Sequence, residues 1–316
     1  MIRFHLPEAH NSVSFFIGLV DIYARRRELF RDNVEIASFF GSRQLIWNGG
    51  RAILIPYDAK SFKNFIKLYN EYGIPYRFTF TNTMITEEYL DDYECNDILD
   101  FADNGLNEVI VYSPILEEYI RKTHPNMKIT SSTCKCIRDI DEVKAELAKP
   151  YSLVVLDFNF NNDFEKLEML TPEERKRCEI LSNPVCRPGC TRRLEHYNYI
   201  SKAQLTYPEW LDSQRMLPPD KRVSPKEHFT EWECKDRIFD PFGNKEYPLR
   251  VTPELVYGKY AEMGFENFKI EGRMANIMML AEQISRYMAK PECIDEFRYE
   301  VMVRACDPDR YKLNLI

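Results

Sequence analysis

The sequence predicts an α/β fold, a TIM-like (β/α)8 barrel, and three observations lead to this prediction. Most of eight short strand-like runs are apolar and lack the alternation of a strand that faces solvent, as expected for parallel strands covered on both faces. Amphipathic stretches of helical length separate most of these runs. No glycine-rich phosphate loop follows the first run, which disfavours a doubly wound open sheet, the alternative fold.

The predicted strands span residues 2–6, 34–40, 76–81, 108–113, 127–133, 152–158, 178–182 and 267–271. Residues 51–57 are a candidate ninth strand, most simply the second arm of a hairpin that turns at 48–50. The predicted helices span residues 61–72, 87–102, 114–122, 139–149, 163–177 and 191–201. Pro114 suits a first helical position, and Thr171-Pro172-Glu173-Glu174 is typical of a helix cap.

The regular order stops after the seventh predicted strand. Residues 184–253 contain nine of the eighteen prolines, together with Cys186, Cys190 and Cys234. A connection of this length is usually functional or a small subdomain. We interpret residues 1–316 as a single barrel domain and residues 184–253 as an insertion over the barrel mouth, between the last two strands.

Composition limits the class of protein. With 44% hydrophobic and 29% charged residues in 316, the chain is globular. A net charge of −7 disfavours generic nucleic-acid binding. No apolar run is long enough to cross a bilayer, and residues 1–20 make a poor signal peptide. We therefore expect a cytoplasmic protein.

Cysteine spacing predicts a metal site. In a reducing cytosol the nine cysteines stay thiols, so clustered ones indicate metal or redox chemistry. Cys186 and Cys190 follow the seventh strand, and we expect them to bind metal with the more distant Cys234. Cys134, after the fifth strand, is the tentative fourth ligand. Cys178 is set aside because it begins its strand, about 16 Å from the strand's other end. Zinc and an iron–sulfur cluster both remain open.

The last predicted strand carries a charged run. Side chains alternate along a strand, so Lys269, Glu271 and Arg273 should point into the barrel lumen or its mouth. Buried charges need partners, so a Lys–Glu or Glu–Arg pair is expected. These residues would bind an anionic substrate or co-substrate, or alternatively close the barrel as a structural ion-pair network.

Other polar residues end predicted strands, where barrel enzymes place their sites. Asp157 is a candidate catalytic residue, and Asn82 and Asn183 are candidates for substrate binding. His5 and His196 are further candidates for substrate binding. The alternative for each is a structural role, in helix capping or in packing.

Two motifs resemble the collagenase-like peptidase family, peptidase family U thirty-two. One runs from Asn183 through Cys186-Arg187-Pro188-Gly189-Cys190 to Arg193, and the other is Lys269-Ile270-Glu271-Gly272-Arg273-Met274. The resemblance implies a TIM-like barrel. Some relatives carry a four-cysteine [4Fe–4S] cluster and act in oxygen-independent hydroxylation of ubiquinone precursors or RNA bases, some with prephenate as hydroxyl source. The spacing of Cys186, Cys190 and Cys234 differs from theirs.

The leading functional hypothesis is an iron–sulfur barrel protein that performs an oxygen-independent hydroxylation or a related redox modification. Its substrate would be small or attached to a polymer, and anionic. A peptidase or other hydrolase with a structural metal site is an alternative, although no recognisable nucleophile-and-base motif is present. A non-catalytic partner subunit of a second barrel protein is the other alternative.

Overall fold

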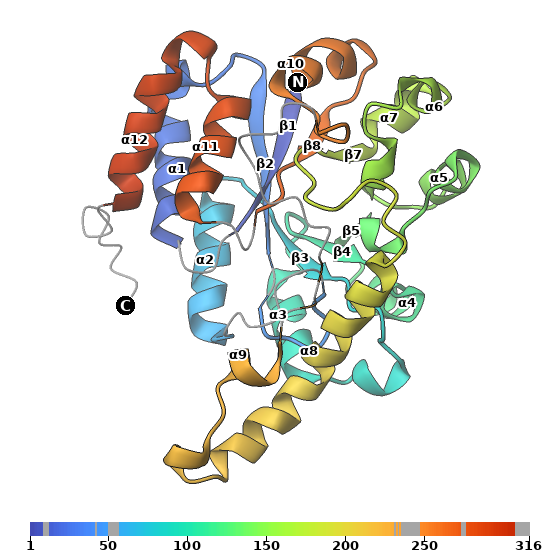
Figure 1. Cartoon of the computed structure of the whole chain (residues 1–316), viewed down its shortest axis with the longest axis vertical. Helices are drawn as coiled ribbons and strands as arrows, with labels where there is room; N and C mark the ends of the chain where they lie inside the picture. Colours follow the sequence, from blue (N-terminus) through green and yellow to red (C-terminus); the bar gives the residue numbers. More distant parts are fainter. Residues whose placement is uncertain are drawn as a thin grey trace.

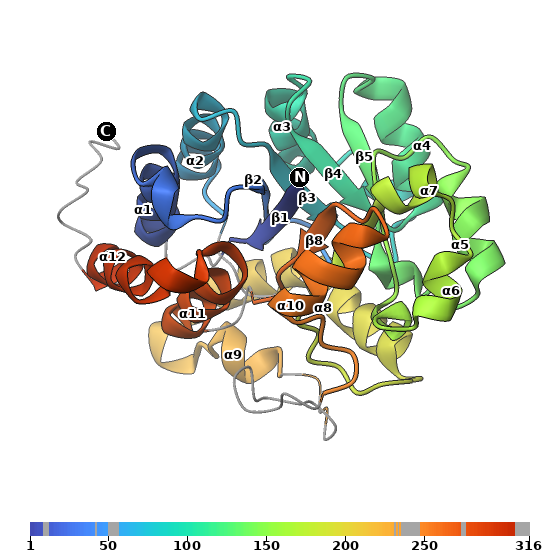
Figure 2. The ribbon, with the colours of Figure 1, turned by 90° about the horizontal axis from the view of Figure 1, so that it is seen from above.

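The chain folds into a closed barrel of eight parallel strands that follow one another in sequence order. The computed structural model describes residues 1–8, 13–41, 43–49, 57–230, 232, 234, 247–272 and 276–306. The strands are β1 Ile2–Pro7, β2 Val34–Gly41, β3 Tyr76–Phe80, β4 Glu108–Val111, β5 Lys128–Ser131, β6 Val154–Val155, β7 Cys178–Leu181 and β8 Asn267–Lys269. They lie in the centre of the molecule, with helices around them (Figures 1 and 2).

The predicted barrel is confirmed, and the open sheet was the wrong alternative. All eight strands form at the predicted places, but several end early because polar residues at their carboxyl ends begin short helical turns. Ser132 caps the 3-10 turn Thr133–Lys135 after β5, and Asp157 caps the turn Phe158–Phe160 after β6. The candidate ninth strand lies outside the described residues, apart from Tyr57.

Helices connect the strands. They are α1 Val13–Arg25, α2 Ala59–Glu71, α3 Tyr93–Ala102, α4 Pro114–Thr123, α5 Ile140–Leu147, α6 Phe164–Glu168, α7 Pro172–Lys176, α8 Arg193–Arg215, α9 Pro225–His228, α10 Pro253–Leu255, α11 Ile277–Met288 and α12 Ile294–Cys306. In the described part of the chain, no helix is both long and apolar enough to span a membrane.

Three predicted helices differ from the structure by more than two residues at an end or are divided in two. Residues 87–102 hold a short 3-10 turn and then α3, because Asp92 caps α3 by accepting from the Cys95 N–H at 2.8 Å. Residues 163–177 hold α6 and α7, since Thr171 and Glu174 form a capping box that starts a new helix. The helix predicted at 191–201 begins at Arg193 and continues through Pro208 to Arg215.

The long helix α8 lies across the carboxyl ends of the strands. Near its middle, Ser201 Oγ accepts the Thr83 N–H after β3 at 2.9 Å, and Gln204 Oε1 accepts from Gln44 after β2 at 2.6 Å. Its far end packs against α9 through Trp210. In Figure 1 both helices lie at the lower end, opposite the start of β1. α8 therefore contacts the segments that follow β2 and β3.

Aromatic residues fill the layer between the barrel and its helices. Phe39 of β2 contacts Phe16 of α1 and Tyr69 of α2, with ring centroids 5.4 and 4.5 Å apart. All three side chains are buried. Offset and edge-on aromatic pairs add to the hydrophobic stabilisation, so these contacts hold the outer helices in register with the strands.

Candidate functional site

A buried carboxylate, Glu179 of β7, joins the charged groups inside the barrel. Its Oε2 accepts a hydrogen bond from Arg77 Nη1 at 2.6 Å, and its Oε1 lies 3.4 Å from Lys269 Nζ. Arg77 Nε also lies 3.2 Å from Glu108 Oε2. Burial alone would raise the pKa of Glu179, but the charges of Arg77 and Lys269 lower it well below its usual value. The lumen therefore holds a row of alternating charges.

Lys269 ends this row at the mouth. It is the last residue of β8, is almost fully buried, and places its Nζ 3.9 Å from the centroid of the Phe40 ring. The sequence predicted charge pairing within the run of Lys269, Glu271 and Arg273. In the structure the Lys269 ammonium lies beside the Glu179 carboxylate, because β7 and β8 are neighbouring strands.

His5 of β1 is buried next to the same carboxylate. Burial lowers the pKa of His5 to about 3, and the charges of Arg77 and Lys269 act in the same direction. The ring Nδ1 lies 2.7 Å from Ser38 Oγ, and Nε2 lies 3.3 Å from Asn267 Oδ1. A neutral ring that accepts from the hydroxyl and donates to the amide oxygen satisfies both nitrogens. His5 is thus an uncharged part of the lumen network.

Asn183 and Glu271 join the loops that follow β7 and β8. Asn183 Nδ2 donates to the Glu271 carbonyl at 2.9 Å, and its Oδ1 accepts the Glu271 N–H at 2.6 Å. The Glu271 carboxylate accepts the Val185 N–H at 3.3 Å. Arg273 lies outside the described residues. Both described residues therefore fix the loop that leads to Cys186, and their predicted contacts with a ligand stay predictions.

Asp157 is buried against α8. Its Oδ2 accepts a hydrogen bond from Arg193 Nη1, and its Oδ1 accepts the Asn159 N–H at 2.9 Å. The Arg193 guanidinium also donates to the Thr133 carbonyl at 3.2 Å and stacks 4.1 Å from the centroid of the Phe158 ring. The Asp157 carboxylate is therefore held as the partner of a buried cation. A catalytic role for it stays a prediction.

Two other predicted residues, Asn82 and His196, make contacts that involve α8. Asn82 Nδ2 donates to the carbonyls of Ile46 and Ser201, at 2.6 and 3.2 Å, and so ties α8 to the end of β3. His196 of α8 stacks on Trp232, with ring centroids 5.6 Å apart and an interplanar angle of 12°. Each residue has a clear structural contact, and substrate binding by either one stays a prediction.

The loop that carries Cys186 and Cys190 is fixed to its neighbours by backbone contacts. The Cys190 carbonyl accepts a hydrogen bond from Arg138, and the Gly189 N–H donates to Asn159 Oδ1 at 2.8 Å. Both thiols are partly exposed. The helix predicted at 191–201 would begin directly after Cys190, but α8 begins at Arg193.

Two more thiols lie on the neighbouring loop. Cys134 is buried in the turn after β5, and Cys136 ends that turn with a left-handed φ of 53° and a partly exposed side chain. Burial raises the pKa of Cys136, with the charge of Arg193 acting against it. Arg138 follows on the same segment and bonds the Cys190 carbonyl. The two cysteine-bearing loops therefore meet at the barrel mouth.

The predicted ligand set is Cys186, Cys190, Cys234 and Cys134. Within the residues that the structure describes, no three His, Cys, Asp or Glu side chains are placed to hold a metal ion together. The thiols present have the right chemistry for a soft metal or a cluster, but this conformation does not gather them. Cys178 lies buried at the start of β7, as expected, and burial raises its pKa.

The sequence analysis did not single out three charged residues that form buried ion pairs: Arg77, Glu179 and Arg193. All three are buried, and each forms an ion pair. Arg77 and Glu179 stand inside apolar predicted strands, where a charged residue has to face the lumen and find a partner. That pattern was a usable signal for both residues.

The fold and these contacts define a (β/α)8-barrel protein with an ion-paired lumen and a cysteine-bearing mouth. No protein-family model matches the chain, and no curated protein matches it. Among solved structures, the chain is similar to that of "the U32 Peptidase Mk0906", with 12% identical residues and a TM-score of 0.49. The match covers 87% of this chain and 95% of that one. At this identity and score, the similarity carries no argument about activity.

Proposed function

We propose that the chain is an iron–sulfur barrel enzyme of the collagenase-like peptidase family, which modifies an anionic organic substrate at the barrel mouth. The proposed reaction is an oxygen-independent hydroxylation or a related redox step. A [4Fe–4S] cluster would supply the electron transfer, with Cys186, Cys190, Cys234 and Cys134 as its ligands. Zinc is the alternative metal.

The observation that carries the proposal is the meeting of two cysteine-bearing loops at the mouth. Arg138 bonds the Cys190 carbonyl, so the segment after Cys134 and Cys136 runs beside the segment of Cys186 and Cys190. Thiols are the ligands that soft metals and iron–sulfur clusters prefer. Because the described side chains do not surround a common point, metal binding would have to bring the two loops closer together.

Lys269 supports the anionic nature of the substrate. Its ammonium group lies at the carboxyl end of β8, where barrel enzymes bind their substrates. Glu179 lies 3.4 Å away and is shared with Arg77, which itself approaches Glu108. The positive charge of Lys269 is therefore positioned by the lumen and can attract an anionic group that enters from the mouth.

Metal analysis of anaerobically purified protein tests the proposal. We expect iron and acid-labile sulfide in the wild type, and their loss in Cys186→Ala and Cys190→Ala. Cys293→Ala is the matched control, because Cys293 is partly exposed on a 3-10 turn before α12 and should keep full iron. A colourless wild type with stoichiometric zinc would overturn the cluster.

A second assay separates the proposal from the hydrolase alternative. Peptide-library cleavage is measured for the wild type and for a variant that lacks Cys186, Cys190 and Cys234. The proposal predicts no cleavage by either protein. Peptide cleavage that survives the loss of the three thiols would contradict a redox function and favour a hydrolase.

A further inference from the structure

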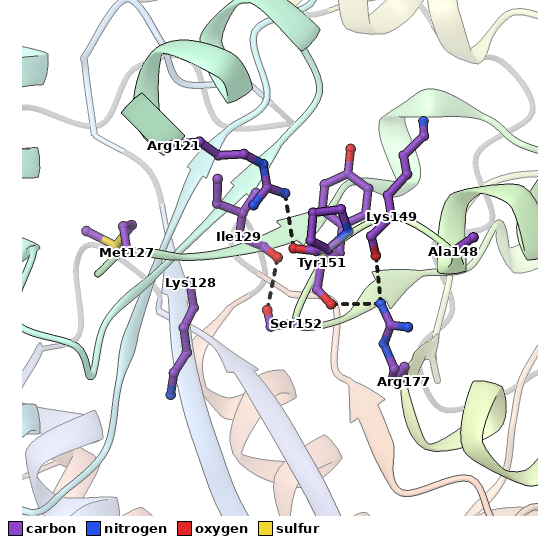
Figure 3. A pocket seen from close by; sticks show the side chains of 10 residues that line it. Arg121, Met127, Lys128, Ile129, Ala148, Lys149, Tyr151, Ser152 and Arg177 are labelled. Atoms are coloured by element: carbon purple, nitrogen blue, oxygen red, sulfur yellow. Dashed lines mark hydrogen bonds between the residues drawn. The ribbon is translucent and has the colours of Figure 1, made fainter. Parts of the chain in front are cut away.

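A basic pocket lies at the end of the barrel opposite the mouth. It has a volume of about 540 Å³ and is lined by residues at the amino ends of three strands (Figure 3). Lys128 begins β5, Ser152 lies just before β6, and Arg177 lies just before β7. Because the strands are parallel, this pocket is separate from Cys186, Cys190 and Lys269, which lie at or beyond the carboxyl ends of β7 and β8. Its volume is within the usual range of small-molecule sites.

The charge of the pocket opposes that of the whole chain. Four cationic side chains line it, namely Arg121, Lys128, Lys149 and Arg177, and none of its described lining residues is Asp or Glu. The chain as a whole has a net charge of −7. A local excess of cations on an acidic protein attracts anions at short range, within about 10 Å at ordinary salt.

Two of the four cations have no carboxylate partner in the described part of the chain. Among the described residues, neither Lys128 nor Arg177 forms an ion pair, whereas Arg121 pairs with Glu117 at 2.9 Å. Arg177 donates instead to the carbonyl of Leu147 at the end of α5 and to the carbonyls of Lys149 and Tyr151 in the loop that follows, at 2.7 to 2.9 Å. These bonds fix the wall of the pocket and hold the guanidinium at the carboxyl end of α5, with no described carboxylate against it.

Stabilisation of helix ends accounts for only some of the cations that line the pocket. Arg121 lies in the last turn of α4, where a cation stabilises the helix dipole. Lys128 lies at the start of a strand and is exposed, so neither a helix end nor burial accounts for its place in the pocket. Lys149 pairs with Glu146 at 2.6 Å, but Glu146 also receives Lys135 at 2.6 Å. The carboxylate charge nearby is thus shared between several cations.

We propose that this pocket binds the oligophosphate group of a small molecule. The four cationic side chains stand around the rim and do not meet at one point (Figure 3). An arrangement of this kind favours several anionic groups in a row over a single compact ion. Phosphate oxygens suit these donors, because lysine binds phosphate as a point charge and arginine adds directed N–H groups.

Calorimetric titration with tripolyphosphate at low salt tests the proposal. We expect saturable binding that weakens about tenfold in Lys128→Gln/Lys149→Gln, since two of the four charges are then absent. Both side chains are exposed, so their removal should leave the fold intact. Lys122→Gln is the matched control: it removes an exposed lysine of α4 that does not line the pocket, and it should bind as the wild type does.

Two results would overturn the proposal: no saturable binding by the wild type, or equal affinity of the double variant and of Lys122→Gln. The titration does not depend on metal content or on turnover at the mouth. A failure here therefore leaves the proposed redox function untouched, and the reverse also holds.

Discussion

Charged side chains have different surroundings in the lumen of the barrel and in the basic pocket at the amino ends of the strands. In the lumen, Glu179 compensates both Arg77 and Lys269, at 2.6 and 3.4 Å. At the opposite end, Lys128 and Arg177 line a pocket with no carboxylate among its described residues. A charge inside the barrel has lost its water and needs a partner, whereas an exposed one is solvated. We therefore expect the charges of the lumen to matter most for stability and the exposed lysines of the pocket to matter least.

The largest effect is expected for Glu179→Gln. The change removes the buried carboxylate that pairs with both Arg77 and Lys269, so the free energy of unfolding should fall by about 3–5 kcal/mol. Urea denaturation measures the loss. Glu173→Gln is the control, because Glu173 is exposed on α7, and it should change stability by less than about 0.5 kcal/mol. Equal stability of the two variants would break the contrast between lumen and surface.

Arg193→Gln should have the next largest effect. It leaves the buried Asp157 carboxylate without its cation, and we expect a loss of about 3 kcal/mol in the free energy of unfolding. Adding Asp157→Asn removes the orphaned charge and should restore part of that loss. A double variant that is no more stable than Arg193→Gln would mean that the unpaired Asp157 carboxylate is not what destabilises Arg193→Gln.

His5 gives a pH-dependent test of the lumen. Its pKa is about 3 in the folded protein and near 6.5 when unfolded, so the unfolded chain binds one more proton between these values. Stability should therefore fall as pH is lowered from 6.5 toward 3, by up to about 1.4 kcal/mol per pH unit. His5→Gln should reduce the slope by about that amount between pH 6.5 and 5. An unchanged slope would mean that His5 titrates normally.

The smallest effect is expected at the basic pocket. Lys128→Gln removes an exposed cation that makes no ion pair with any described residue, so the urea midpoint should shift by less than the equivalent of about 0.5 kcal/mol. A loss above about 2 kcal/mol would place Lys128 among the structural charges and remove the difference between the two ends.

Most of the fold was accessible from the sequence, because strands covered on both faces are short apolar runs and stand out between amphipathic helices. Element ends were harder to place. Residues 152–158 have strand composition, yet β6 holds only Val154–Val155, since Asp157 caps the next turn. The extent of α8 was missed: the predicted helix ends at residue 201, whereas α8 continues through Pro208 to Arg215.

The sequence indicated only some of the charged contacts in the lumen. The alternation of the last strand correctly placed the charge of Lys269 in the lumen, but its neighbour Glu179 depends on the register between β7 and β8. Sequence spacing cannot supply that register. Nor can spacing show whether Cys186 and Cys234 approach one another, because the chain between them is long and holds the whole of α8. Distances across such an insertion come only from tertiary contacts.

Iron and acid-labile sulfide, measured together on the anaerobically purified wild type, test the central claim most directly. The account predicts a coloured protein with about four iron and four sulfide per chain, as expected for one [4Fe–4S] cluster. A colourless protein that carries one zinc per chain, or neither iron nor sulfide, would contradict it.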